Sequence, residues 1–354
     1  MRRRTFLAAS AVAPFAGALS FATQGHASPA AGRWRSFDMT YAVDIPANSG
    51  PTKIWLPLPH DAPYQRLESM SWSGTAPISL YTDLDSGARA VHAAWADGGE
   101  ARKVTLNVRA GILPRSVPLA SGASGGAMPD DVKKFLAPNA MIRTDGIVKE
   151  TADKIVAGKS DPLTKAQLVF DWIVENTFRD PKVKGCGIGD IRAMLVTGNL
   201  GGKCGDLNAL FVGLLRAAGV PARGVYGVRV APSAHYSAMG TRNVDISKAQ
   251  HCRAEFWTAA TGWVPADPAD VRKVVLDDKL TLNEPKMADL RRFLFGSWEA
   301  NWVAFNHSRD VKLAPSSTVV NFFMYPEGET AKGPLDGVDP DAYGYKITVR
   351  EATT

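Results

Sequence analysis

The sequence predicts an α+β protein with a β domain in front of it, and three observations along the chain lead there. Between residues 34 and 113, short segments alternate apolar and polar residues, which is typical of strands. From residue 130 the apolar residues recur at helical spacing, and after residue 221 strand-like segments return. Helices followed by antiparallel strands favour an α+β fold rather than alternating β-α-β units.

The first 27 residues have the features of an export signal. Three arginines at positions 2–4 precede Thr5-Phe6-Leu7, an uncharged Ala-rich run extends to about Ala22, and small residues follow near Ala27. The arrangement resembles the twin-arginine type of signal peptide, so we expect a periplasmic or secreted mature protein. No second long apolar segment follows, and we therefore expect no membrane span after signal removal.

The charge of the chain argues against nucleic acid as a partner. The net charge is +6, and removal of the three signal arginines leaves +3 for the mature chain. Nucleic-acid-binding domains are more strongly basic, with the charge concentrated on one face. The length allows two or three domains, and 45% apolar residues are enough for packed cores.

The β domain is expected over residues 33–115. Phe37–Val43 and Val104–Val108 alternate in polarity, while Lys53–Pro59 ends in prolines, as edge strands do. A small β-sandwich accounts for these segments. Residues 116–129 are rich in Gly, Ser and Ala and are expected to be a linker. The linker contains a G-x-S-x-G match at residues 122–126, but with no strand before it and no helix after it we do not interpret it as a nucleophile elbow.

Residues 130–275 are expected to form the α+β core, with a central helix inside Gly201–Pro221. Shorter helices are predicted at Ile147–Val156, Lys165–Phe178 and Ile191–Val196. The central helix has one continuous apolar face, formed by Leu207, Leu210, Phe211, Leu214, Leu215 and Ala218. It starts after two glycines and ends at Gly219 and Pro221.

Cys204 lies at the N-terminus of this helix. The helix dipole and the unpaired N–H groups favour an anion there, so the thiol pKa falls to roughly 3.5–7.5 when a basic partner helps. The same N–H groups could face the oxyanion of an acyl-transfer intermediate. The alternative is that Cys204 is simply a small buried apolar residue, as most free cysteines are.

The remaining segments are mostly strand-like. Strands are expected at Arg223–Val230, Arg253–Trp257 and Gly262–Pro265. Residues 276–354 form a C-terminal extension, in which an aromatic-rich segment packs on the core and two closing strands follow. These segments are Phe293–Phe305, Val319–Tyr325 and Tyr343–Val349.

A thiolate nucleophile needs a base, and the base needs an acceptor that orients it. Of the five histidines after the signal (His60, His92, His235, His251 and His307), only His251 opens a predicted strand shortly after the cysteine helix, 47 residues from Cys204. Asp267 follows 16 residues later, at the end of the next predicted strand. Two adjacent antiparallel strands would place His251 beside Asp267.

These blocks resemble the transglutaminase-like superfamily. Gly202–Asp206 with Leu210–Arg223 is similar to its cysteine block, and His251 with Glu255 and Trp263–Pro268 are similar to its histidine and aspartate blocks. The resemblance covers residues 140 to 275. It implies a papain-like core with Cys204 as nucleophile, His251 as base and Asp267 as the residue that orients the base.

One position departs from the family pattern. Members commonly have an aromatic residue two positions after the histidine, whereas Arg253 stands here. This departure concerns the substrate cleft more than the three catalytic positions.

Other readings of the same residues remain open. Asp270 could take the place of Asp267, while Asp206 and Asn208 are expected to cap or pair within the domain, and Glu255 to pair with an arginine. Gly198–Cys204 fails as a phosphate loop, because Thr197 and Cys204 replace residues that such a loop requires. We expect no cofactor and no metal: successive strand residues point to opposite faces, so His251, Cys252 and Asp267 would not converge on an ion, and no calcium-binding loop is found.

The chain has three cysteines, an odd number. In an oxidising compartment the simplest pairing is Cys186 with Cys252, which leaves Cys204 as a free thiol. This pairing rests on the count alone.

The function implied is acyl transfer on peptide or protein amides of the cell envelope through a thioester. Hydrolysis, as in a cysteine peptidase or amidase, is preferred over transglutaminase-type cross-linking. The alternative is a non-catalytic binding or assembly module that keeps the fold.

Overall fold

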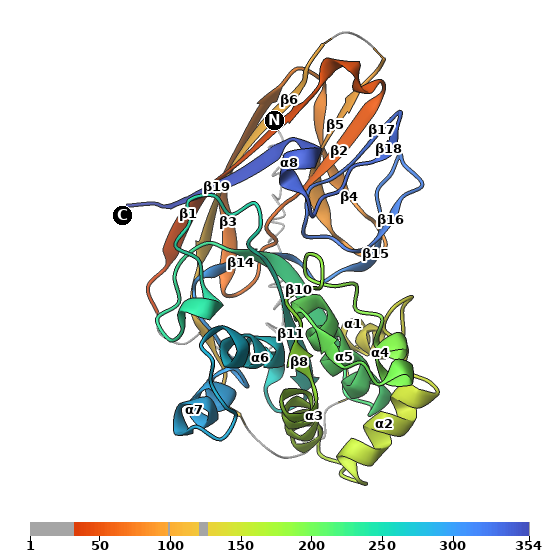
Figure 1. Ribbon diagram of the computed structural model, residues 1–354, viewed down its shortest axis with the longest axis vertical. Helices are drawn as coiled ribbons and strands as arrows, with labels where there is room; N and C mark the ends of the chain where they lie inside the picture. The colour runs from red at the N-terminus through yellow and green to blue at the C-terminus, as the bar shows by residue number, and fades with distance from the viewer. Residues whose placement is uncertain (1–31, 98–99, 120–126, 354) are drawn as a thin grey trace, which may run out of the picture.

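The computed structural model describes residues 32–97, 100–119 and 127–353, and has a β-sandwich above an α+β part (Figure 1). The α+β prediction is therefore confirmed. The predicted signal peptide and the G-x-S-x-G match at 122–126 lie outside the described residues. In the part of the chain that the structure describes, no helix is long and apolar enough to cross a bilayer.

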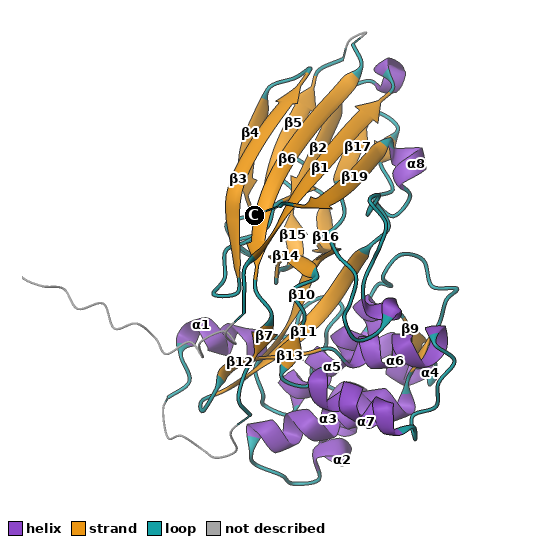
Figure 2. Ribbon diagram, turned by 90° about the vertical axis from the view of Figure 1, so that its left-hand side faces the viewer, coloured by secondary structure: helices purple, strands orange, loops and turns teal. Residues whose placement is uncertain are grey.

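Two antiparallel sheets face each other in the sandwich (Figure 2). One has the order β19-β1-β6-β3, and the other has the order β18-β17-β2-β5-β4. The strands are β1 (Arg35–Ile45), β2 (Thr52–Pro57), β3 (Gln65–Gly74), β4 (Ile78–Thr82), β5 (Arg89–Trp95), β6 (Arg102–Ile112), β17 (Glu327–Thr330), β18 (Gly333–Pro334) and β19 (Tyr345–Glu351).

The alternation of apolar and polar residues along β1 determines which side chains of this strand enter the sandwich core. Phe37, Met39, Tyr41 and Val43 are buried, while the residues between them are more exposed. The last strand of the chain, β19, lies antiparallel to β1, and β17 lies beside β2. The C-terminal strands therefore close a sandwich that begins at the N-terminal end of the described chain.

The lower part packs helices on a four-stranded antiparallel sheet of order β12-β11-β10-β14. Its strands are β10 (Ala222–Arg229), β11 (Gln250–Thr258), β12 (Gly262–Ala266) and β14 (Trp302–Asn306). The helices are α1 (Asp130–Lys133), α2 (Ile147–Val156), α3 (Pro162–Asn176), α4 (Ile191–Thr197), α5 (Cys204–Ala217), α6 (Pro268–Asp277) and α7 (Pro285–Phe293), with α8 (Pro340–Tyr343) beside the sandwich.

Short elements complete the structure. They are β7 (Arg115–Ser116) paired with β13 (Ser297–Trp298), β8 (Phe178–Arg179) paired with β9 (Gly201–Gly202), β15 (Arg309–Lys312) paired with β16 (Val319–Phe322), and the 3-10 turns η1 (Ala47–Ser49), η2 (Lys134–Leu136) and η3 (Ser237–Met239).

Helix α5 is buried at every residue, because it packs between the sheet and the helices α2, α3 and α6. The helix contacts β10 and β11, and Phe211 of the predicted apolar face lies against Phe256 of β11. Its partner strand β11 starts at Gln250, three residues earlier than predicted, so His251 lies inside the strand. The central helix and the histidine strand are thereby held in direct contact.

Candidate active site

Cys204 is the first residue of α5, and the backbone around it is fixed by hydrogen bonds. The Asp206 carboxylate accepts from the N–H of Lys203 at 2.9 Å and from that of Gly189 at 2.8 Å. The N–H of Gly205 donates to the Cys186 carbonyl at 2.7 Å, and those of Asp206 and Leu207 donate to Lys203. The sequence allowed the N–H groups at this helix start to face an oxyanion, but those of Gly205, Asp206 and Leu207 already donate to carbonyl groups of the protein.

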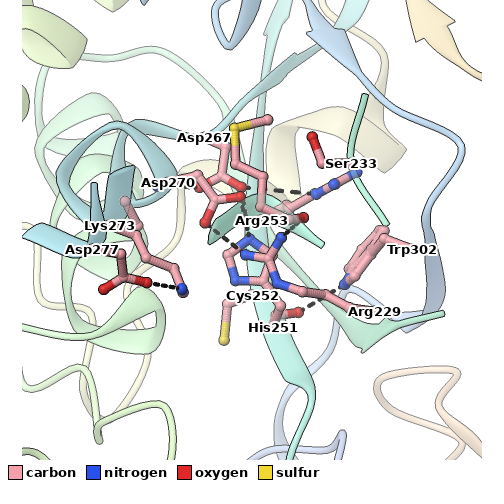
Figure 3. Close-up of polar contacts among 12 residues, drawn as sticks. Arg229, Ser233, His251, Cys252, Arg253, Asp267, Asp270, Lys273, Asp277 and Trp302 are labelled. Carbon is pink, nitrogen blue, oxygen red and sulfur yellow. Dashed lines mark hydrogen bonds and ion pairs between the residues drawn. The ribbon is translucent and has the colours of Figure 1, made fainter. Parts of the chain in front are cut away.

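His251 and Asp267 are joined by a short hydrogen bond (Figure 3). His251 is the second residue of β11, Asp267 directly follows β12, and these two strands pair antiparallel. Nε2 of His251 lies 2.7 Å from Oδ2 of Asp267. With Nε2 so engaged, Nδ1 is the ring nitrogen left for a thiol. His251 and Asp267 therefore lie side by side on neighbouring strands, as predicted.

Asp267 is itself held in place from two sides. Its Oδ1 accepts from Asn208 Nδ2 at 3.1 Å and from the N–H of Asp270 at 3.2 Å, where Asp267 caps helix α6. Asn208 also donates to the Cys252 carbonyl at 2.8 Å. Because Asn208 lies one turn after Cys204 on α5, the helix that carries the thiol also orients the carboxylate.

Asp270, the alternative partner of the histidine, lies farther from the ring. Its Oδ2 is 3.4 Å from His251 Nε2 but has no hydrogen-bond partner among the described residues. Its Oδ1 pairs with Arg229 Nη2 at 2.6 Å, and all three side chains are buried. Geometry therefore favours Asp267 as the hydrogen-bond acceptor, with Asp270 as a second, paired negative charge.

Comparison with known proteins places this arrangement in a family. A model of the transglutaminase-like superfamily matches residues 149–268, a range that holds Cys204, His251 and Asp267. A protein of Haemophilus influenzae, named only as uncharacterized, is 40% identical over 330 residues, which are 87% of this chain and 89% of that protein. This chain belongs to the transglutaminase-like superfamily.

Similar solved structures are more distant in sequence. A proposed cysteine protease from Cytophaga hutchinsonii has a TM-score of 0.56 at 14% identity, over 90% of this chain and 98% of that one. The periplasmic domain of TgpA from Pseudomonas aeruginosa has a TM-score of 0.37 at 14% identity, over 72% of this chain and 92% of that one. The first of these likenesses shows the fold and nothing beyond it.

Cys204 and His251 of this transglutaminase-like core line the same cleft, which has a volume of about 420 Å³. Hydrogen bonds from Cys186 and Cys252, and then the charge and hydrogen bond of His251, hold the pKa of Cys204 well below its usual range against the opposing effect of burial. The pKa of His251 is raised: burial and Arg229 lower it, but the charges of Asp270, Asp267 and Cys204 outweigh them. Both shifts favour a thiolate–imidazolium pair.

The departure at Arg253 has a structural explanation. Its guanidinium is buried 4.8 Å from the ring centre of Trp302, whose Nε1 donates to the His251 carbonyl at 3.1 Å. The Nε of Arg253 lies 3.8 Å from Asp267 Oδ2. An aromatic ring therefore lies beside the histidine strand, supplied by β14, and Arg253 is sandwiched between this ring and the carboxylate.

The cysteine pairing expected from the count is wrong in the structure. Cys186, Cys204 and Cys252 are all free and buried. Their Sγ atoms lie within 4.8 Å of one another, so the two extra thiols surround Cys204 rather than pairing away from it.

Arg229, Cys186 and Cys252 are the site residues that sequence reasoning missed as contributors. Arg229 stands in the otherwise apolar strand segment Val225–Val230, where a buried charge signals a buried counter-ion. The grouping of the three cysteines carries no comparable signal, since it depends on how distant segments pack.

Proposed function

We propose that this protein is an exported cysteine hydrolase of peptide or protein amides, with Cys204 as nucleophile, His251 as general base and acid, and Asp267 as the residue that orients His251. The observation that carries the proposal is the buried chain from Cys204 through His251 to Asp267 at the wall of one cleft. A buried cysteine with only a packing role would not need a histidine beside it that is hydrogen-bonded to a carboxylate, nor a lowered pKa; this combination is typical of catalytic sites.

In the proposed reaction the Cys204 thiolate attacks the amide carbonyl and the C–N bond breaks. The amine leaves with the proton that His251 donates, and a thioester to Cys204 remains. Water then gives a proton to His251 and attacks the thioester, the C–S bond breaks, the carboxylic acid is released, and the thiolate–imidazolium pair is restored. An amine in place of water would give the transglutaminase outcome.

The cleft favours substrates with a negative charge. Its lining includes five basic residues and one acid, namely Arg179, Lys203, Arg229, Lys248, Lys273 and Asp245. Arg229, Lys248 and Lys273 are paired with aspartates, so the argument rests on Arg179 and Lys203. Nη1 of Arg179 is buried and has no hydrogen-bond partner among the described residues. A carboxylate near the scissile amide would supply that partner. The substrates that we propose are therefore acidic peptides of the cell envelope, and the export that this implies rests on the signal-like N-terminus.

The first experiment measures the rate of Cys204 alkylation against pH in the mature protein, with the modified cysteine identified by mass spectrometry. Wild type should show a Cys204 pKa well below about 8.5, and His251→Ala should raise it. An ordinary Cys204 thiol that does not respond to His251 would overturn the catalytic proposal. The binding-module alternative would then be the better account of the fold.

The second experiment separates the reaction types. A set of peptides is offered in matched pairs, with Glu or Gln at one position, together with a labelled primary amine. Free acid without amine incorporation identifies hydrolysis, and preference for the Glu member tests the role of the cleft charges. Arg179→Gln should remove that preference while Cys204 alkylation stays at the wild-type rate.

A further inference from the structure

Cys186 and Cys252 form no bond to substrate in the proposed reaction, yet their thiols lie beside the thiol that does. The Sγ atoms of Cys186, Cys204 and Cys252 lie within 4.8 Å of one another. Cys186 comes from the loop before α4, Cys204 from the start of α5 and Cys252 from β11. Three segments that are distant in the sequence therefore bring all three cysteines of the chain together.

A fourth sulfur atom lies next to this three-thiol cluster. Cys252 Sγ lies 3.8 Å from Sδ of Met324, which is fully buried. Cys186 Sγ lies 3.3 Å from the Gln250 carbonyl, to which its proton is donated. The neighbourhood thus combines three thiols and a thioether, the donors that soft metal ions prefer over oxygen ligands.

The spacing of the thiols suits a single metal ion. Zinc–sulfur bonds of about 2.3 Å place the sulfurs of a tetrahedral or trigonal site about 3.8–4.0 Å apart. Sulfurs within 4.8 Å of one another reach that geometry by moves of about 1 Å or less, within the range of side-chain rotation. Entry is available as well, because Cys186 and Cys204 both line the cleft.

We propose that Cys186, Cys204 and Cys252 form a binding site for one soft, thiophilic metal ion. Binding releases the protons that the thiols still hold and occupies the Cys204 sulfur, so a metal-bound protein cannot use that sulfur as a nucleophile. The site depends on three sulfurs and not on catalysis, so it stands or falls separately from the proposed hydrolase activity.

The test uses Cd²⁺ as the probe, added to the mature protein under anaerobic, reduced conditions. Cadmium–thiolate bonds give an ultraviolet charge-transfer band whose intensity follows the number of bonds. We expect one Cd²⁺ per chain in wild type. Cys186→Ser, Cys204→Ser and Cys252→Ser should each reduce the band by about a third and weaken binding about tenfold or more, since loss of even an outer-shell partner typically costs about 10–100-fold.

Matched controls make the outcome decisive. Mg²⁺ should produce no band. Tyr325→Phe removes a hydroxyl group beside Cys186 but no sulfur, and should bind Cd²⁺ as wild type does. Circular dichroism and thermal melting verify that each serine variant is folded. Wild-type band intensity and affinity in folded Cys186→Ser and Cys252→Ser would overturn the proposal, because Cys204 alone, or Cys204 with His251, would then hold the ion.

Discussion

Strand β11 carries two buried groups of charges on one face, and they behave differently. Alternate residues of a strand share a face, so His251 and Glu255 project to the same side. At one end is the histidine cluster, made of His251, Asp267, Asp270 and Arg229. At the other end is the glutamate cluster, made of Glu255, Arg115 and Arg223.

The glutamate cluster is fully matched. Both oxygens of Glu255 accept from arginines, Oε1 from Arg115 and Oε2 from Arg223 at 2.6 Å. Burial would raise the pKa of Glu255, but Arg115 and Arg223 outweigh it and lower that pKa to about 2. Since Arg115 belongs to β7 and also donates to the Trp263 carbonyl, the cluster ties the chain that leaves the sandwich to the central sheet.

The histidine cluster is left partly unmatched. Within the described part of the chain, one oxygen of Asp270 accepts no hydrogen bond, and it lies 3.4 Å from Nε2 of His251, whose charge can change. Equal burial therefore does not decide the role of a charge. A cluster saturated by fixed charges stabilises the fold, whereas one that contains a titratable ring beside a thiol is suited to chemistry.

The largest effect that would distinguish the roles of the two clusters is a loss of turnover in Asp267→Asn. An amide at this position keeps the shape but no longer fixes the His251 tautomer or stabilises the imidazolium. We expect kcat/KM to fall about 10²–10⁴-fold. The measurement is hydrolysis of the best peptide from the matched-pair screen, with thermal melting as the fold control. Turnover within a few-fold of wild type would remove Asp267 from the proposed mechanism.

The next effect is on stability, and it belongs to the other cluster. Glu255→Ala leaves two arginines near each other without their shared carboxylate, which should cost about 3–5 kcal/mol of unfolding free energy. Urea unfolding of the variant beside wild type measures this. The Cys204 pKa from alkylation should stay unchanged. A shift of that pKa would show that the two clusters are coupled, and the contrast between them would fail.

The pH dependence of stability sharpens the same contrast. The pKa of Glu255 is about 2 in the folded protein and lies near its ordinary value of about 4.3 when unfolded. A lowered acid pKa contributes stability above the unfolded pKa, and this stability is lost as pH falls through the folded pKa. At about 1.4 kcal/mol per pKa unit, the contribution is about 3 kcal/mol.

The measurement compares wild type with Glu255→Gln by urea unfolding between pH 7 and pH 2. The difference in unfolding free energy should be constant down to about pH 5 and should shrink steadily below it. A difference that keeps its full size at pH 2.5 would mean that Glu255 does not titrate in this range.

The features of the histidine cluster that depend on the spacing of neighbouring residues in the chain could be predicted from the sequence. The apolar face of α5, the position of Cys204 at its start and the order of Cys204, His251 and Asp267 follow from periodicity and motif. The pairing of Asp270 with Arg229 and the gathering of three thiols do not, because they depend on how β10, α6 and the loop before α4 pack. The number of cysteines shows that one must stay unpaired, but it does not show which sulfurs lie close enough to bond. The expected pairing of Cys186 with Cys252 was therefore wrong.

The closing strands show the same limit within the fold. Residues 343–349 were predicted to form a strand, and β19 is found at Tyr345–Glu351. Its partner β1 lies about three hundred residues earlier in the chain, and pairing across such a separation is set by which edge remains free, not by local propensity.

The smallest expected effect distinguishes the two aspartates within the histidine cluster. In Asp270→Asn the amide oxygen can still accept from Arg229, and Asp267 still fixes the ring, so turnover at the pH optimum should fall only about tenfold. The pKa of His251 should nevertheless fall, because the Asp270 charge helps to raise it against burial and Arg229. Histidine-selective NMR titration measures that pKa, with the His251 signal assigned by its loss in His251→Ala. If Asp270→Asn instead abolished turnover as strongly as Asp267→Asn while the His251 pKa stayed constant, the nearer carboxylate would not be the orienting one, and the roles of the two aspartates would have to be exchanged.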